Sequence, residues 1–160
     1  MQWCPMMKKA DIKLLIVANG DFNSNYGGGQ VYVRNLVDEL IDRRHDIAIL
    51  SFVGGDVPCI TRSYRGVDLF ELSGPDEEII QRVLEVCRPD VIHAHAGKAT
   101  MVSLGEKLNI PVYVTVHHGG LVCPAGTLLD HRGELCGCAA SQQNCLPCVL
   151  HGIRGGRYFY

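Results

Sequence analysis

Strand-like and helix-like segments alternate along most of this chain. Residues 12–18 form an aliphatic run of strand length, and residues 27–44 then carry apolar side chains at helical spacing. The alternation continues with strand-like segments at residues 46–52, 67–72, 88–95 and 110–118, and helical segments at residues 75–87 and 97–109. Strands that alternate with helices in this way favour parallel βαβ units with right-handed crossovers.

The predicted fold class is therefore α/β. We expect a Rossmann-like parallel sheet with helices on both faces, plus a cysteine-rich loop segment near the C-terminus. The 160 residues allow one domain, or a domain with a small appendage. Residues 1–10 show no periodicity and are expected to be a disordered lead-in, with the domain occupying residues 11–160.

Charge and hydropathy exclude several classes of function. The formal net charge is −2, with both signs spread along the chain, so no basic face is offered to nucleic acid. No apolar run approaches the roughly 20 residues that span a bilayer. Eight cysteines without a secretory signal indicate a reducing compartment, and the predicted location is cytoplasmic.

Glycines and histidines follow three of the predicted strands. They are Gly27, Gly28 and Gly29 after the first strand, His95 after the fourth, and His117 and His118 after the fifth. Ligands of open α/β sheets bind outside the carboxyl ends of the strands, so we expect these residues to converge in one crevice. His93 should instead face the packing, because neighbours in a strand point to opposite sides.

The triple glycine, Gly27 to Gly29, is suited to binding an anion. Without side chains, backbone N–H groups at the start of a helix can approach a phosphate, which the helix dipole also favours. The match to a dinucleotide fingerprint is poor, because Tyr32 stands where the third glycine belongs and the preceding loop is long. A nicotinamide or flavin domain is therefore disfavoured. A merely flexible loop is the alternative to a phosphate or sugar site.

Five cysteines gather between residues 123 and 148. They are Cys123, Cys136, Cys138, Cys145 and Cys148. The two-residue spacing between Cys145 and Cys148 lets both thiolates reach one ion, and the same donors suit a structural zinc or an iron–sulfur cluster. Free thiols and disulfides are the alternatives, because the spacings are irregular and one cysteine is left over. A nucleophilic Cys123 acting with His117 is a further alternative.

Several motifs, in this order, resemble a known family. "GGGQVYVRNLVDEL", "PDVIHAHAGKAT", "IPVYVTVHH" and "CPAGTLLDHRGELC" with "CLPC" are similar to the N-terminal domain of GT-B glycosyltransferases of family 4, over about residues 12–151. The resemblance implies transfer of a sugar, with retention of configuration, from a nucleotide-sugar donor to a sugar or lipid acceptor. It implies a reaction in the cleft between two Rossmann-like domains and no cofactor for catalysis.

The resemblance also implies roles for particular residues. Gly27 to Gly29 would face the donor phosphates, and His117 would contact the donor sugar near the reacting centre. Family members commonly carry aspartate where this chain has His118. We expect these residues to lack the C-terminal, donor-binding domain of the family, and we expect the isolated domain to be inactive.

Two further expectations concern partners. The acceptor of this family can be membrane-associated, which allows peripheral membrane contact, although no basic amphipathic helix in the sequence argues for it. The alternative function is a Rossmann-like binding or interaction module that is stabilised by a bound metal ion and has no catalytic activity.

Overall fold

The computed structural model describes residues 12–23, 27–55, 59–117, 119, 122–126 and 128–154. The chain divides into two compact units, Met1–Thr115 and Val116–Tyr160. The expected lead-in at residues 1–10 lies outside the described residues. The first unit is the α/β domain, and the second contains the cysteine-rich segment.

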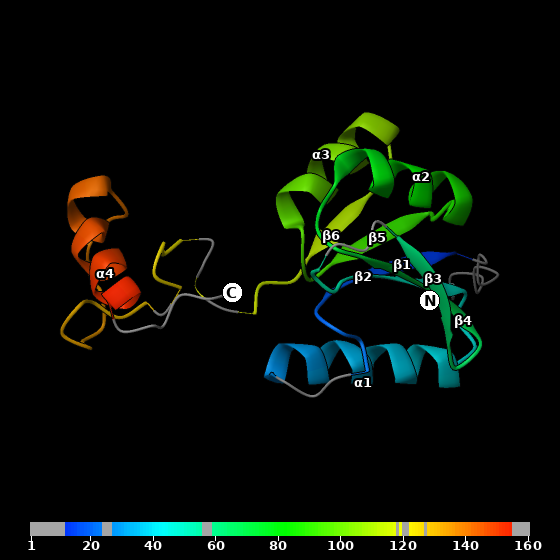
Figure 1. The fold of residues 1–160 in the computed structure, drawn as a ribbon, viewed down its shortest axis with the longest axis horizontal. Helices are drawn as coiled ribbons and strands as arrows, with labels where there is room; N and C mark the ends of the chain where they lie inside the picture. Colours follow the sequence, from blue (N-terminus) through cyan, green and yellow to red (C-terminus); the bar gives the residue numbers. More distant parts are fainter. Residues whose placement is uncertain are drawn as a thin grey trace, which may run out of the picture. The chain divides into compact units, whose positions relative to one another are not determined.

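A six-stranded sheet forms the first unit, with the strand order β3-β4-β2-β1-β5-β6 (Figure 1). The strands are β1 (Leu14–Asn19), β2 (Ile47–Phe52), β3 (Ile60–Tyr64), β4 (Val67–Leu72), β5 (Val91–Ala94) and β6 (Val112–Val114). All neighbouring pairs are parallel except β3 and β4, which are antiparallel. The mostly parallel sheet confirms the predicted α/β class.

The central strand β1 is buried on both faces, as its aliphatic sequence predicts. Leu15 and Val17 belong to one core cluster, whereas Ile16 and Ala18 belong to the other. Because side chains alternate along a strand, these two pairs point to opposite sides of the sheet. The two core clusters therefore lie on the two faces of the same sheet.

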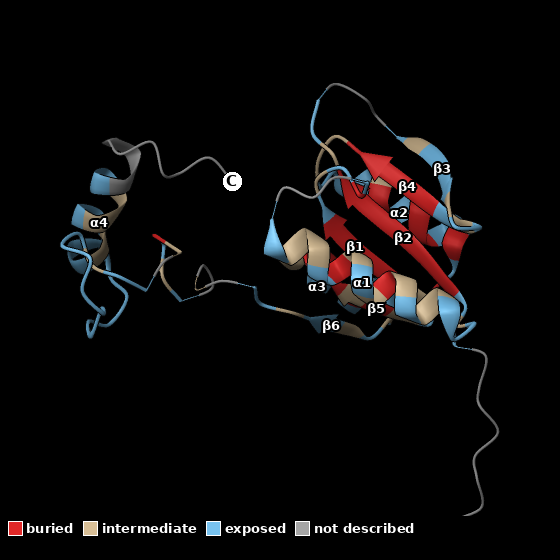
Figure 2. Cartoon of the chain, turned by 90° about the horizontal axis from the view of Figure 1, so that it is seen from below, coloured by how far each residue is buried: buried red, intermediate tan, exposed pale blue. Residues whose placement is uncertain are grey.

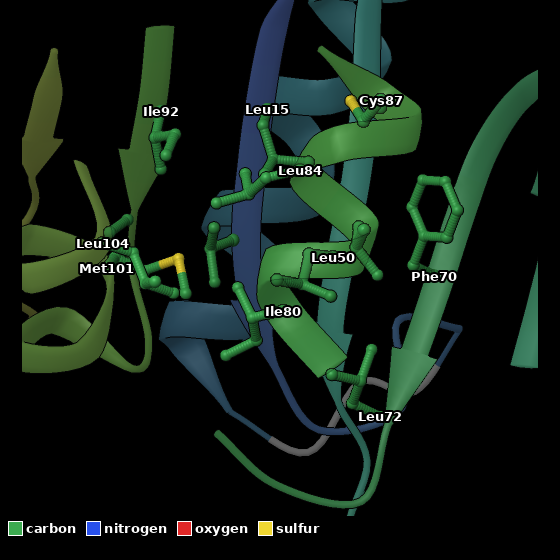
Figure 3. Close-up of a cluster of buried hydrophobic side chains, with 14 of the residues drawn as sticks. Leu15, Leu50, Phe70, Leu72, Ile80, Leu84, Cys87, Ile92, Met101 and Leu104 are labelled. Carbon is green, nitrogen blue, oxygen red and sulfur yellow. The ribbon is translucent and has the colours of Figure 1, made fainter. Parts of the chain in front are cut away.

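Three helices cover these faces: α1 (Gly28–Asp42), α2 (Glu77–Cys87) and α3 (Lys98–Leu108). Figure 1 shows α1 on one side of the sheet and α2 with α3 on the other. Val33 and Val37 of α1 pack in one cluster. The other cluster includes Ile80, Leu84 and Cys87 of α2 and Met101 and Leu104 of α3 (Figure 3). Helices on both faces are thus confirmed.

Strand β3 was not predicted from the sequence. It is an edge strand whose middle residues are exposed, so it lacks the apolar run that marks the other strands. Arg62 forms an ion pair at 2.6 Å with the buried carboxylate of Glu71 on β4. At the tip of the hairpin, Arg65 and Gly66 have positive φ angles of 49° and 89°, which suit a tight two-residue turn.

The hairpin is attached to α1 by a polar network. Arg65 reaches Asp38 at 2.9 Å and Asp42 at 2.7 Å, and the Tyr64 hydroxyl donates to Asp38 at 3.0 Å. These groups are partly exposed to solvent, so each ion pair contributes little to stability on its own. The network connects the edge of the sheet to the helix that begins at the triple glycine.

The second unit has little hydrophobic core. Ala125 is the one buried residue among those that the structure describes in this unit, and Figure 2 shows most of the segment as exposed. A hairpin pairs Leu129 with Leu135. Its turn is organised by Asp130, whose carboxylate accepts the backbone N–H groups of Glu134 and Arg132, and these bonds lower the pKa of Asp130. Helix α4 (Gln142–Arg154) follows.

Replacing Ile80 with alanine should test the packing of α2. Ile80 is fully buried, whereas Val86 on the same helix is 74 % exposed. We expect Ile80→Ala to lower the free energy of unfolding by about 2–5 kcal/mol, and Val86→Ala to change it by less than about 0.5 kcal/mol. Urea denaturation followed by circular dichroism measures both. Equal losses would contradict the described burial of α2.

Candidate functional site

The strand order reverses between β1 and β5. From β1 the sheet extends through β2 and β4 in one direction, and from β5 it extends to β6 in the other. Helices α1 and α3, which follow these two strands, cover opposite faces of the sheet (Figure 1). In open α/β sheets such a reversal, at the carboxyl ends of the strands, is where ligands bind. The candidate site is therefore the edge formed by the ends of β1 and β5 and the first turns of α1 and α3.

Helix α1 begins without a side-chain cap. Gly27 is the N-cap residue, its φ of −164° is ordinary extended backbone, and the first turn contains no acidic residue. A Cβ atom added at Gly27 or Gly28 would meet nothing within 4 Å. The fold itself therefore does not require glycine at these two positions. Gly27 and Gly28 are exposed, and uncapped N–H groups of a first helical turn are suited to binding an anion.

Helix α3 begins in a similar way, whereas α2 does not. Gly97 caps α3 without a side-chain hydrogen bond, and no acidic residue follows in the first turn. In α2, the Asp76 carboxylate accepts the Ile79 N–H at 3.1 Å, and two glutamates occupy the first turn. A carboxylate at a helix start would compete with an anionic ligand. Of these three helices, the two that flank the reversal thus carry no carboxylate at their starts that would compete with an anion.

His95 lies beside the start of α1. It is 5 % exposed, and its backbone N–H donates to Val17 O of β1 at 2.9 Å. The centroid of its ring is 5.9 Å from that of Tyr32 on α1 and 4.2 Å from that of His93. The Lys98 ammonium group of α3 donates to His95 O at 2.7 Å. The structure thus brings His95 together with both helix starts.

His93 is half-buried, and it connects β5 to the end of β6. Its Nε2 atom lies 2.7 Å from the Thr115 hydroxyl, and the Thr115 N–H donates to Ala94 O at 3.0 Å. We expected His93 to face the packing. Its ring instead contacts a polar partner and the His95 ring, because residues two apart along a strand point to the same side of the sheet.

The loop after β1 is held against α1. Gly20, with a φ of 79°, donates its N–H to Phe52 O at 2.7 Å and accepts the Ser51 hydroxyl at 2.6 Å. The Gln30 side-chain amide donates to Asn19 O at 3.1 Å. A Cβ atom at Gly20 would lie 2.1 Å from the Gln30 side-chain nitrogen, so this side chain would have to shift, and the φ of 79° strains residues other than glycine.

Sequence reasoning missed Gly20, Gln30, Gly97, Lys98 and Thr115 as parts of this edge. The signal that was present is a glycine directly after a strand, which occurs at Gly20, and a glycine directly before a helix, which occurs at Gly97. The contacts of Gln30 with Asn19 and of Thr115 with His93 depend on how separate segments pack, whereas Lys98 contacts His95, three residues earlier.

The structure does not show where the second histidine pair, His117 and His118, lies relative to this edge. His117 is exposed and belongs to the second unit, and His118 lies outside the described residues. The expected convergence of His117 and His118 with the glycines and His95 therefore stays a prediction. So does the role of His117 near the reacting centre.

The five clustered cysteines all lie in the second unit. Cys136 and Cys138 are exposed, and Cys123, Cys145 and Cys148 are half-buried. In the part of the chain that the structure describes, no three histidine, cysteine or acidic side chains are gathered closely enough to hold a metal ion. The zinc or iron–sulfur site stays a prediction.

Two cysteines of the first unit behave differently from those five. Cys87 is buried in the core against Leu84, and burial raises the pKa of its thiol. Cys59 is exposed at the start of β3, and desolvation raises the pKa of its thiol as well. A raised pKa favours the protonated, less reactive form of the thiol at both positions.

The fold and this edge together define an α/β domain whose reversal point suits a ligand with phosphate or sugar groups. Residues 26–134 match the sequence model of Glycosyltransferase Family 4, and this span contains the starts of both uncapped helices. The chain belongs to Glycosyltransferase Family 4, and its family activity is glycosyl transfer from a sugar donor to an acceptor.

A search of curated proteins found no match to the chain. Among the helices that the structure describes, none combines the length and the apolar character needed to cross a membrane.

Gly97 should be far less tolerant of substitution than Gly28. A Cβ atom at Gly97 would lie 2.6 Å from Cε2 of Phe52, and the φ of 55° strains any other residue. We expect Gly97→Ala to lower the free energy of unfolding by about 1–3 kcal/mol. Gly28→Ala should leave it unchanged or raise it slightly, because alanine favours the helix. Urea denaturation compares the two variants, and equal losses would contradict the described contact with Phe52.

Proposed function

We propose that this chain is the acceptor-side, N-terminal domain of a retaining glycosyltransferase that uses a nucleotide-sugar donor. One observation supports the proposal. Helices α1 and α3 both begin at a glycine without a capping side chain, they flank the point where the strand order reverses, and both starts lie within the residues that match Glycosyltransferase Family 4. A nucleotide sugar contains a diphosphate, which is the kind of group that such helix starts favour. The sugar or lipid acceptor would then lie on the side of this domain.

Stabilisation of the leaving group is the first chemical task of the site. When the bond between the sugar and the diphosphate breaks, negative charge grows on the phosphate oxygens. Backbone N–H groups near Gly27, Gly28 and Gly29 are fixed by α1, so they can stabilise this charge without reorganising. The positive end of α3 at Gly97 adds to the same field.

The histidines have different proposed roles. His95 is held between the His93 and Tyr32 rings, so we assign it to the wall of the ligand site, where an imidazole can donate a hydrogen bond to a phosphate or a sugar. His117 is the proposed residue at the reacting centre. There it would stabilise developing charge on the donor sugar without acting as a nucleophile. His118 would contact the donor beside it.

We also propose that turnover requires a second domain that binds the nucleotide. In GT-B enzymes the reaction lies between two domains, and the edge formed by β1, β5, α1 and α3 supplies one wall of such a site. These 160 residues by themselves would then bind a ligand at this edge without transferring sugar. A cytoplasmic location with peripheral access to a lipid acceptor is compatible with this function.

Gly28→Val should block the phosphate site without unfolding the domain. The added side chain has open space, so it would occupy the volume that the ligand needs. In NMR titrations with UDP-glucose, GDP-mannose and ADP-glucose, at least one donor should shift the amide signals of Gly28, Gly29 and Gly97. The variant should weaken that binding by at least about tenfold, or about 1.4 kcal/mol.

Gly74→Val is the matched control for this titration. Gly74 has equally open space and precedes α2, the capped helix, so binding should be retained. If no donor shifts these amides in the unmodified chain, or if Gly28→Val binds normally, the proposed phosphate site is wrong.

His117→Ala should affect the rate more than donor binding. In a protein that carries both domains, removal of a group that acts on the transition state should lower kcat by about 10²–10⁴-fold, with a small change in donor KM. His131→Ala is the control, because His131 is exposed in the 129–135 hairpin of the same unit. Unchanged kcat in His117→Ala would remove this residue from the mechanism.

A further inference from the structure

The second unit needs a source of order other than hydrophobic burial. Leu135 is 86 % exposed, and Val122 and Leu146 are also exposed. Ala125 is too small to supply a core, and it is the one buried side chain described in this unit. The backbone nevertheless forms a hairpin and a helix of 13 residues. Segments with so little buried apolar surface are commonly ordered by cross-links or by metal ions.

Helix α4 presents two cysteines on one side. Cys145 and Cys148 are one turn apart and both half-buried. Residues three apart in a helix have Cβ atoms about 5–6 Å apart. Two thiolates on a tetrahedral zinc ion, with bonds of about 2.3 Å, lie about 3.8 Å apart, which side-chain rotation can achieve. The helix start is fixed, because Ser141 accepts the Asn144 N–H at its hydroxyl and the Cys145 N–H at its carbonyl.

A third cysteine stands next to a residue that borders the same hollow as α4. Pro124, the direct neighbour of Cys123, lines an apolar hollow together with Cys145, Leu146 and Val149. The Cys123 N–H donates to Gly119 O at 2.8 Å, which fixes the backbone there. Pro124 and Cys145 therefore border the same hollow. This shared hollow is the observation that groups Cys123, the direct neighbour of Pro124, with the α4 cysteines.

The fourth donor comes from the segment after the hairpin. The Cys136 N–H donates to Leu128 O at 2.9 Å, so this cysteine is anchored at the base of the 129–135 hairpin. Cys138 follows two residues later, and both side chains are exposed. Either thiolate can complete a set of four, which leaves one cysteine of the five outside the set.

We propose that the Val116–Tyr160 unit is a zinc-dependent structural module. Cys123, Cys145, Cys148 and one thiolate from the Cys136–Cys138 pair bind one Zn²⁺, and each thiol releases its proton on binding. The described side chains do not converge as a set of three or more, so metal binding includes a local ordering step that draws the hairpin and residue 123 toward α4. Such coupling between metal binding and folding is typical of small zinc modules.

The metal content of the reduced chain, purified without oxygen or chelator, is the first test. We expect about one zinc ion per chain, and cobalt added to the metal-free protein should give the visible spectrum of a tetrahedral thiolate site. Cys123→Ser, Cys145→Ser and Cys148→Ser should each lose the metal, as should the double replacement Cys136→Ser with Cys138→Ser. Cys59→Ser is the matched control, because this exposed cysteine lies in the first unit, and it should keep the metal.

Hydrogen exchange separates metal binding from loss of the whole fold. Removal of zinc should speed amide exchange in residues 119–154 and leave β1 and β2 protected. The proposal is overturned if the reduced wild-type chain holds no zinc and takes up no cobalt, or if Cys145→Ser keeps its full metal content. Visible absorption typical of an iron–sulfur cluster would overturn the assignment of the metal as zinc. Unchanged amide hydrogen exchange in residues 119–154 after zinc removal would overturn the structural role of the metal.

Discussion

Burial of β1 between two helical layers is the constraint on which the domain depends. Leu15 and Val17 pack toward α2 and α3, while Ile16 and Ala18 pack toward α1. A shift of one residue in register would exchange these two sets, so the apolar pattern fixes how β1 pairs with β2 and β5. The same register brings Gly20 and His95 to one edge of the sheet. The position of the candidate site therefore follows from the packing of four aliphatic or small residues.

Most of the fold could be predicted from the sequence, because buried parallel strands and amphipathic helices leave clear patterns. Strand β3 left none, since the exposed side chains of an edge strand are polar. The final strand was expected over residues 110–118, but β6 spans only Val112–Val114, because it lies at the other edge and pairs with β5 alone. Helix α4 contains Pro147 and lies in the cysteine-rich segment, where no apolar periodicity was recognised.

The site was predictable to a smaller extent. Gly28 and His95 could be found because they stand at the ends of recognisable elements. The contact of Thr115 with His93 of β5 depends on the packing of segments that meet only in the folded sheet. The contact of Lys98 with His95 O is local and depends on the turn at Gly97 that leads into α3. His117 and the clustered cysteines remain predictions, since their roles depend on a ligand or a metal ion that would hold them in place.

The absence of a capping side chain at Gly27 has a consequence for protein engineering. Serine, aspartate or asparagine at an N-cap stabilises a helix by roughly a few tenths of a kcal/mol relative to glycine, so a substitution at Gly27 would raise thermal stability slightly. An acidic cap there would place a negative charge at the point proposed for the donor phosphates. Selection for heat resistance and selection for donor affinity would thus favour different residues at position 27.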